Sequence, residues 1–167
     1  MSFQQIHVLG GETFATAEAN IVFTTVLGPC VSVCLFDPVL KIGGMNHFLL
    51  PSGGTQQAAG RDRFADVAMQ TLLNDMISLG GSPWRMQAQL FGGKYAHLHN
   101  TDIGAENAKA AKRFLLDNSI RLVASDLGGN VARWVTFNPT TGETNLKRQN
   151  LSRHADNDAT VTRAMRR

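Results

Sequence analysis

Strand-like segments outnumber helical ones along the chain, and this imbalance limits the folds that the sequence can adopt. Segments rich in β-branched and aromatic residues, with Gly, Pro and Asp between them, predict strands. These segments cover residues 5–9, 12–18, 21–26, 31–36, 42–50, 85–91, 122–126, 131–137 and 143–148. Only residues 64–79 and 102–116 repeat their apolar positions every three to four residues, which is typical of helices. Clustered strands with few helices favour an α+β fold over a doubly wound parallel sheet.

Glycines and capping residues mark the ends of the predicted elements. The glycine pair at residues 80–81 ends the first helix, because glycine readily takes the left-handed conformation after a helix C-terminus. Thr101 or Asp102 supplies the N-cap of the second helix. The glycine pairs at residues 92–93 and 128–129 lack the flanking pattern of a phosphate loop, and they are more typical of strand ends or bulges.

Length and composition indicate one folded domain. The chain has 167 residues, of which 43% are apolar and only 17% are charged. Disordered chains show the opposite combination of low hydrophobicity and high net charge. No apolar run reaches the roughly 18 residues that a membrane span requires. The first nine residues contain no lysine or arginine, so we expect no secretory signal and a cytoplasmic protein.

The net charge of +3 is concentrated near the C-terminus. Residues 147–167 hold six basic and two acidic side chains, whereas residues 1–146 hold ten basic and eleven acidic ones. A basic face that could bind nucleic acid is therefore not expected on the folded part. We predict a domain over residues 1–151 and a polar, basic, flexible tail over residues 152–167. The tail either adds a weak, salt-sensitive attraction to acidic partners or is a solvated terminus.

A stiff corner precedes Cys30 between two predicted strands. Pro29 fixes its own φ and pushes Gly28 away from the helical conformation, so Cys30 is presented at a defined position. The next predicted strand carries His47, and adjacent strands can place the two side chains together. A catalytic thiol needs such rigidity, a nearby base and peptide N–H groups for an oxyanion. The alternative is structural: a buried cysteine that acts as a small apolar residue, and a histidine that only hydrogen-bonds.

A metal site is a further alternative. Cys30, Cys34, His97 and His99 offer four ligands of the types that bind zinc. Structural zinc cysteines usually lie on a knuckle, however, and not inside an apolar strand. In a strand, the two cysteines lean to one face about 13 Å apart, which is beyond the reach of a disulfide.

Five blocks of the sequence resemble one known family. The two long blocks are TTVLGPCVSVCLFDP (residues 24–38) and KIGGMNHFLLP (residues 41–51). The shorter blocks are Phe91-Gly92-Gly93, Ile103-Gly104-Ala105-Glu106-Asn107, and Asp126-Leu127-Gly128-Gly129 followed by Arg133. In this order, and over roughly residues 5–150, the sequence resembles the CheD family of bacterial chemoreceptor glutamine deamidases.

The resemblance implies a fold and an active site. The expected fold is a β-sandwich of mainly antiparallel strands with two or three helices packed on it, similar to the deamidase domain of cytotoxic necrotizing toxins. The aligned catalytic residues are Cys30 as the nucleophile, His47, and Thr24 as the group that orients the imidazole. Pro29 stands where the family commonly has serine, and it has no N–H for an oxyanion, so the Cys30 N–H or a neighbouring backbone group would donate. No metal or organic cofactor is required.

The resemblance also implies the reaction, which is hydrolysis of a side-chain amide. The Cys30 thiolate would attack a glutamine carboxamide, ammonia would leave, and water would release glutamate. An imidazolium at His47 is expected to lower the thiol pKa from about 8.5 into the range of about 3.5–7.5.

The partners implied by the resemblance are proteins of chemotaxis. They are the cytoplasmic region of methyl-accepting chemoreceptors and, in addition, a CheC-type phosphatase. Neither nucleic acid nor membrane insertion is expected. A second interpretation keeps the partners without the catalysis: a regulator that binds receptors or the phosphatase, with Pro29 as the sign of lost activity.

Overall fold

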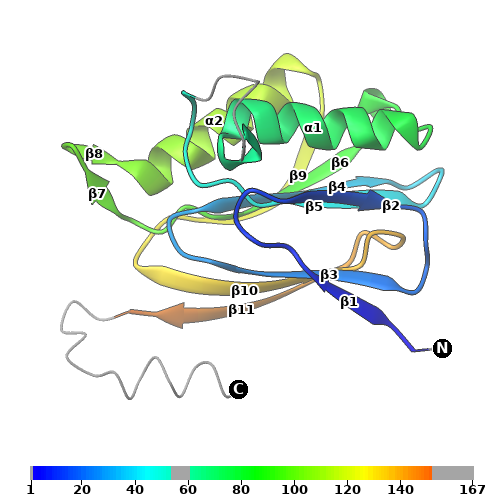
Figure 1. The fold of residues 1–167 in the computed structure, drawn as a ribbon, viewed down its shortest axis with the longest axis horizontal. Helices are drawn as coiled ribbons and strands as arrows, with labels where there is room; N and C mark the ends of the chain where they lie inside the picture. Colours follow the sequence, from blue (N-terminus) through cyan, green and yellow to red (C-terminus); the bar gives the residue numbers. More distant parts are fainter. Residues whose placement is uncertain (1, 54–60, 152–167) are drawn as a thin grey trace.

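Two β-sheets pack face to face, and two helices cover the outer face of one of them (Figure 1). The computed structural model describes residues 2–53 and 61–151. The four-stranded sheet consists, in spatial order, of β1 (Gln4–His7), β3 (Ile21–Leu27), β10 (Val131–Phe137) and β11 (Thr144–Asn150). The five-stranded sheet consists of β2 (Thr13–Thr16), β5 (Ile42–Asn46), β4 (Val31–Asp37), β6 (Gln87–Gly92) and β9 (Arg121–Leu127). The helices are α1 (Ala65–Ser78) and α2 (Ile103–Asp117), with short 3₁₀ turns η1 (Arg61–Arg63) and η2 (Pro83–Arg85).

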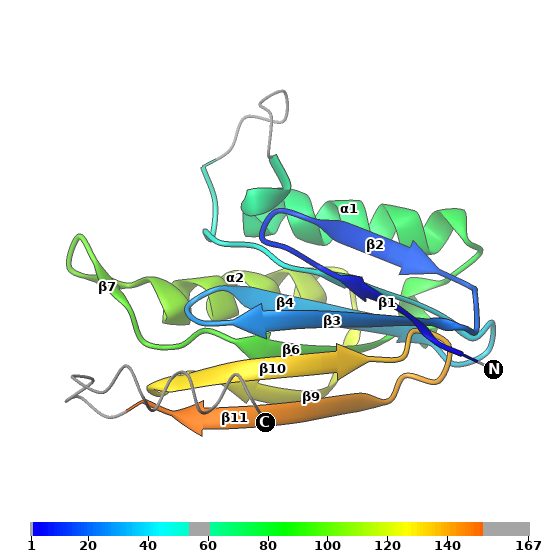
Figure 2. The ribbon, with the colours of Figure 1, turned by 60° about the horizontal axis from the view of Figure 1, so that its bottom comes forward.

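Most neighbouring strands run antiparallel, and the β1–β3 and β6–β9 pairs are parallel. Along β10, buried and half-buried residues alternate, as expected for a strand with one face inside a sandwich. Figure 2 shows the helices on one side of the molecule and β10 and β11 on the other. The expected α+β fold, a sandwich with helices packed on it, is confirmed.

The predicted N-cap of α2 and the predicted glycine stop after α1 are both present in the structure. The carboxylate of Asp102 accepts hydrogen bonds from the N–H groups of Gly104 and Ala105, at 3.1 and 3.3 Å, and so caps the N-terminus of α2. After α1, Gly80 takes a φ of +97°, the left-handed conformation that stops a helix.

The central strand β4 contributes to both hydrophobic cores. Val31, Val33 and Leu35 face the helices and are buried there. Cys34 faces the other way, into the core between the two sheets. The core between the sheets contains Val8, Ile21, Phe23, Leu27, Cys34, Met45, Phe91, Val135 and Phe137. Burial of this apolar area at about 25 cal/mol per Å² is what holds the sheets together.

Two details differ from the sequence prediction. The strand predicted over residues 42–50 ends at Asn46, and the chain then pairs again at two isolated bridges, Phe48 with Val31 and Leu50 with Phe64. A short hairpin that the sequence analysis lacks, β7 (His97–Leu98) and β8 (Thr101–Asp102), precedes α2.

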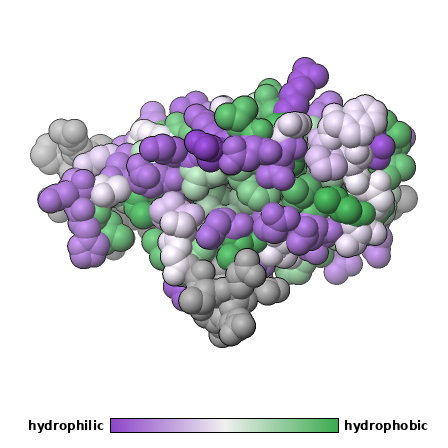
Figure 3. Space-filling model, turned by 90° about the horizontal axis from the view of Figure 1, so that it is seen from above, coloured by the Kyte–Doolittle hydropathy of each residue, from purple (hydrophilic) through white to green (hydrophobic). Residues whose placement is uncertain are grey.

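Seen from above, the helical face carries hydrophilic and hydrophobic side chains interspersed with one another (Figure 3). Within residues 2–53 and 61–151, no helix is long and apolar enough to cross a membrane. The predicted tail over residues 152–167 lies outside the described residues, so the division into domain and tail stays a prediction.

Candidate active site

Cys30 lies at the predicted corner between β3 and β4, and we call residues 28–30 the Cys30 corner. Each carbonyl oxygen of this corner accepts a hydrogen bond from another segment. The donors are the Lys94 N–H to Gly28 (3.0 Å), the Asn107 side-chain amide to Pro29 (3.1 Å) and the Gly93 N–H to Cys30 (2.9 Å). With three consecutive peptide groups held in this way, the direction of the Cys30 side chain is well defined.

The segment behind the corner is packed too tightly for a side chain. Gly92 has a φ of +114°, and a Cβ at this position would collide with the Cys30 carbonyl oxygen. The buried guanidinium of Arg133 donates to the carbonyl oxygens of Gly92 and Gly128, at 3.0 and 2.8 Å. The carboxylate of Asp126, 2.8 Å from Arg133, balances its charge. The two glycine pairs therefore lie at strand ends, as predicted, and Gly92 packs directly against the backbone of Cys30.

His47 follows β5 and faces the same side of the five-stranded sheet as Cys30. Val31 and Phe48 exchange two backbone hydrogen bonds, at 3.1 and 3.0 Å, and this register puts Cys30 and His47 at diagonal positions. Diagonal neighbours have Cβ atoms about 7 Å apart, within reach of a long side chain. Cys30 packs against the core between the sheets, and His47 bonds to Thr25 of the opposite sheet. The predicted nucleophile and base thus lie on one face of the five-stranded sheet, at the end where β4 begins and β5 stops.

The Nδ1 atom of His47 has two oxygen neighbours. It lies 2.9 Å from Oγ1 of Thr25 and 3.4 Å from the carbonyl oxygen of Val8. The Thr25 hydroxyl donates its one hydrogen to that carbonyl at 2.7 Å, so its oxygen accepts from the imidazole. This network assigns the proton of the neutral ring to Nδ1 and leaves the lone pair on Nε2. An unprotonated Nε2 is the group that a general base needs.

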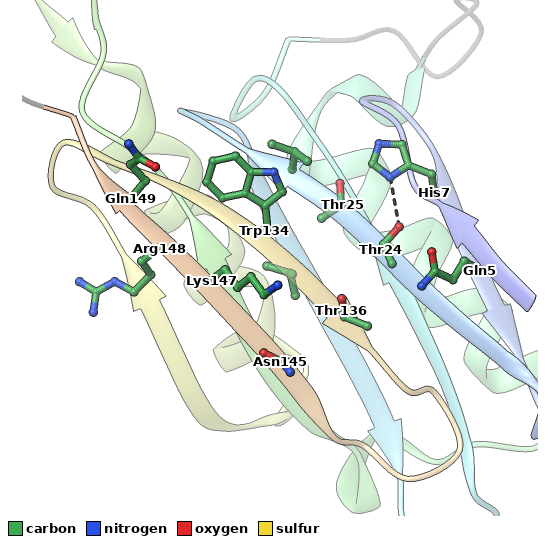
Figure 4. A pocket seen from close by; sticks show the side chains of 12 residues that line it. Gln5, His7, Thr24, Thr25, Trp134, Thr136, Asn145, Lys147, Arg148 and Gln149 are labelled. Atoms are coloured by element: carbon green, nitrogen blue, oxygen red, sulfur yellow. Dashed lines mark hydrogen bonds between the residues drawn. The ribbon is translucent and has the colours of Figure 1, made fainter. Parts of the chain in front are cut away.

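Thr24, the threonine indicated by the resemblance, lies on the opposite face of β3. Its hydroxyl is 3.1 Å from Nδ1 of His7, as the dashed line in Figure 4 shows. With Trp134 it lines a groove of about 680 Å³ on the outer face of the four-stranded sheet. The structure therefore does not bring Thr24 to His47, and the hydroxyl found there belongs to Thr25, one residue later.

The alternation of side chains along β3 explains this shift by one residue. Phe23, Thr25 and Leu27 are buried, whereas Thr24 and Val26 face the other side of the strand. Large apolar residues two positions before and two positions after Thr25 are the sequence signal for its inward orientation.

Burial favours the neutral forms of both candidate catalytic groups. It raises the pKa of the Cys30 thiol, against the opposing effect of the residue's own backbone N–H. It lowers the pKa of His47, and a charge on His7 adds to this effect, whereas the Val8 carbonyl and Glu12 oppose it. These directions run against the expected imidazolium neighbour and lowered thiol pKa, and they favour a neutral thiol beside a neutral imidazole at rest.

The four proposed zinc ligands do not meet. Among the described residues, no group of three or more His, Cys, Asp or Glu side chains could hold a metal ion. Cys34 is buried in the core between the sheets, whereas His97 and His99 are exposed on the β7–β8 hairpin and its turn. The zinc hypothesis for these four residues is wrong.

The fold and the site define a class of protein: an α+β sandwich that carries a cysteine and a histidine on one face of a sheet, where β4 begins and β5 ends. The model of the CheD family, described as CheD chemotactic sensory transduction, matches residues 49–148. The chain belongs to the CheD family. A protein from Zymomonas mobilis named probable chemoreceptor glutamine deamidase CheD is 43% identical over 164 residues, covering 97% of this chain and 86% of the relative. A protein of the same name from Caulobacter vibrioides is 44% identical over 139 residues, covering 83% of this chain and 74% of the relative.

A solved structure shares the fold. The hypothetical protein YfiH from Bacillus licheniformis has a TM-score of 0.51 and 14% identity, over 76% of this chain and 61% of that one. The chain thus spans about three-fifths of that protein. At this identity the likeness shows the arrangement of sheets and helices alone.

Proposed function

We propose that the protein hydrolyses the side-chain amides of specific glutamines on chemoreceptors, giving glutamate and ammonia. The observation that carries this proposal is the placement, on one face of the sheet where β4 begins and β5 ends, of a rigidly held Cys30 and of a His47 whose Nδ1 is held by Thr25 and Val8. Membership of the CheD family and the names of its relatives support glutamine amides on chemoreceptors as the substrate.

The reaction starts from the neutral pair. As the Cys30 sulfur attacks the carboxamide carbon, Nε2 of His47 takes the thiol proton, so the thiolate forms only as it reacts. The developing oxyanion accepts a hydrogen bond from the backbone N–H of Cys30, which already lies close to the sulfur. Pro29 has no N–H and takes no part in this stabilisation.

The same imidazole completes both halves of the reaction. The imidazolium gives its proton to the departing nitrogen, so that ammonia leaves and a thioester remains. His47 then takes a proton from the water that attacks the thioester. When the C–S bond breaks, that proton goes to the sulfur and glutamate is released. Each half of the reaction therefore begins and ends with a neutral His47.

Thr25 and Val8 hold the ring while it gains and loses this proton. Both oxygens accept from Nδ1, so they keep the reactive lone pair on Nε2 and stabilise the imidazolium when it forms. In this proposal Thr25 takes the orienting role that the resemblance gave to Thr24.

The test is incubation of the full-length protein with a receptor cytoplasmic fragment, followed by mass spectrometry of the receptor's glutamine peptides. We expect specific glutamines to become glutamates, and Cys30→Ala to abolish the change. A receptor that keeps all its amides in the presence of the folded protein would refute the proposed activity. This result would favour the second interpretation, in which the protein binds receptors or the phosphatase without catalysing a reaction.

The remaining expectations concern place and partner. A cytoplasmic location follows from a substrate in the cytoplasmic region of receptors. The CheC-type phosphatase stays a prediction, and copurification of the two proteins tests it.

A further inference from the structure

The backbone ladder beside the candidate site ends at the pair formed by Val31 and Phe48. The next hydrogen-bonded pair of the ladder would be Pro29 with Leu50. It does not form, because Pro29 has no N–H to donate and the N–H of Leu50 donates to the carbonyl oxygen of Arg63 in η1, at 3.0 Å. The two chain segments therefore separate at this point. We call the opening between Pro29 and Leu49 the fork.

One side chain joins the two arms of the fork. Asn107 on α2 is fully buried and donates one amide hydrogen to Pro29 O at 3.1 Å and the other to Leu49 O at 2.9 Å. Pro29 directly precedes Cys30, and Leu49 lies two residues after His47. A single amide group thus ties the backbone that carries the nucleophile to the backbone that carries the base.

The helix that carries Asn107 is itself fixed against the Cys30 corner. Gly104 packs so closely on Gly93 and Lys94 that a Cβ there would collide with their carbonyl oxygens. Asn107 follows Gly104 by three residues and therefore lies on the same side of α2. The amide is presented from a support that does not move independently of the corner.

One unpaired atom offsets the contribution of Asn107 to stability. Because both neighbours are carbonyl oxygens, the amide nitrogen faces them, and the buried Oδ1 has no hydrogen-bond partner. A buried unpaired oxygen costs about as much free energy as one or two hydrogen bonds contribute. The net stabilisation is therefore small, which points to geometry as the role of this residue.

We propose that Asn107 is a positioning residue that sets the width of the fork, and with it the separation of the Cys30 sulfur and Nε2 of His47. The inference rests on the proposed function, because it concerns the same two side chains. Without the amide, the arms can separate beyond the Val31–Phe48 pair. A misplacement of about 1 Å between reacting groups can cost about 100-fold in rate.

Kinetics on a receptor fragment test this role. Asn107→Ala should lower kcat by about 100-fold with little change in KM, because the fork orients the catalytic groups and does not hold the substrate. Asn107→Asp keeps the shape but has no amide donors, so it should lose as much. The control is Leu115→Ala, a buried side chain on the same helix about 12 Å along its axis from Asn107. It should lower the melting temperature and leave kcat unchanged.

Two kinetic results would overturn the proposal. One is a wild-type kcat in Asn107→Asp, which would show that the donors are not needed. The other is an equal loss of kcat in Leu115→Ala, which would reduce the effect to general destabilisation of α2.

A double-mutant cycle on thiol reactivity gives a second readout that needs no substrate amide. The rate of alkylation of Cys30 by iodoacetamide is measured at neutral pH with and without His47→Gln, in chains that carry Asn107 or Asn107→Ala. All four chains also carry Cys34→Ala. His47→Gln should slow alkylation severalfold when Asn107 is present and have little effect when it is absent. If Asn107→Ala does not fold, Asn107→Asp takes its place in the cycle.

The cycle separates the two hypotheses. An equal effect of His47→Gln in both backgrounds overturns the role of Asn107, whatever the protein does to receptors. A wild-type protein that leaves receptor glutamines intact refutes the proposed function, while the cycle still measures how the thiol and the imidazole are coupled.

Discussion

Oγ1 of Thr25 lies 2.9 Å from Nδ1 of His47, and this contact bridges the two sheets of the sandwich. Thr25 belongs to β3 in the four-stranded sheet, whereas His47 follows β5 in the five-stranded sheet. Only 2% of Thr25 and 8% of His47 are exposed, so water competes little for Nδ1. The imidazole therefore takes its backbone position from one sheet and its ring orientation from the other.

Replacing Thr25 by valine should slow the reaction far more than the same change at Thr24. Thr25→Val keeps the shape but removes the acceptor at Nδ1, so kcat should fall by about 10- to 100-fold. Thr24→Val removes a contact to His7 on the outer face and should leave kcat close to wild type. Initial rates of glutamine conversion measure both. A larger loss in Thr24→Val would return the orienting role to that residue.

The two cysteines should differ sharply in their contributions. Cys30→Ala should abolish deamidation, because it removes the attacking sulfur. Cys34, only 1% exposed in the core between the sheets, should behave as a small apolar residue. Cys34→Ala should cost about 1 kcal/mol of stability and keep most of the activity. Equal loss of activity in two folded variants would contradict this assignment.

The pH dependence of alkylation should report a thiol with a raised pKa. Burial favours the protonated form of Cys30, so alkylation should reach half its maximal rate at a pH above the ordinary thiol value of about 8.5. The same pH series on the urea-denatured chain gives the midpoint of an unperturbed thiol. This chain carries Cys34→Ala, so that Cys30 is its single reactive thiol. A midpoint in the folded protein below that of the denatured chain would show that a thiolate–imidazolium pair exists at rest.

Mild acid should destabilise the fold through His47. The pKa of His47 is lowered in the folded state by burial, with His7 adding to the effect and the Val8 carbonyl and Glu12 opposing it. The unfolded chain therefore binds the proton more readily, and the free energy of unfolding falls as the pH drops below about 6.5. His47→Gln should reduce the loss of melting temperature between neutral and mildly acidic pH. If His47→Gln loses as much melting temperature in mild acid as the wild type, the acid sensitivity belongs to another titrating group.

Two arginines contact the same carboxylate, and their removal should have unequal effects. Arg133 is 1% exposed and 2.8 Å from Asp126, whereas Arg148 is 53% exposed and 3.5 Å away. Arg133→Met leaves the carboxylate and the carbonyl oxygens of Gly92 and Gly128 without this donor, and should cost about 3–5 kcal/mol. Arg148→Met should cost less than about 1 kcal/mol. Urea denaturation measures both, and comparable losses would contradict the structural role of Arg133.

Local patterns are sufficient to predict most of the elements, and they make Cys30 and His47 candidates that the family resemblance then assigns to the site. The period of the apolar residues gives the strands and helices within a few positions, because it reflects which face of each element is buried. The proline at residue 29 marks the corner before Cys30, and His47 comes directly after β5, the strand that pairs with β4. Both signals lie within a short stretch of sequence.

The contacts of Thr25, Asn107 and Arg133 join distant segments, so local patterns do not reveal them. The apolar residues on either side of Thr25 indicate that it faces inward, but they do not indicate that it meets His47 there. Asn107 reaches Pro29 across 78 positions of sequence. A strand arginine suggests a solvent-facing residue, yet Arg133 is buried because carbonyl oxygens and a carboxylate satisfy its donors.

The pairing of β3 with β10 also decides when a newly made chain becomes able to react. Thr24 lies opposite Thr136 in this pair, so the strand that presents Thr25 has no neighbour on that side until the ribosome has made most of the chain. At about 5–20 residues per second, several seconds of translation pass between the synthesis of Cys30 and the arrival of β10. During this interval the core between the sheets lacks its β10 residues, and β3 lacks the neighbour that holds it in place behind Thr25. The arrangement around Thr25 and His47 is therefore completed late in biosynthesis, and the thiol is most open to oxidants before that moment.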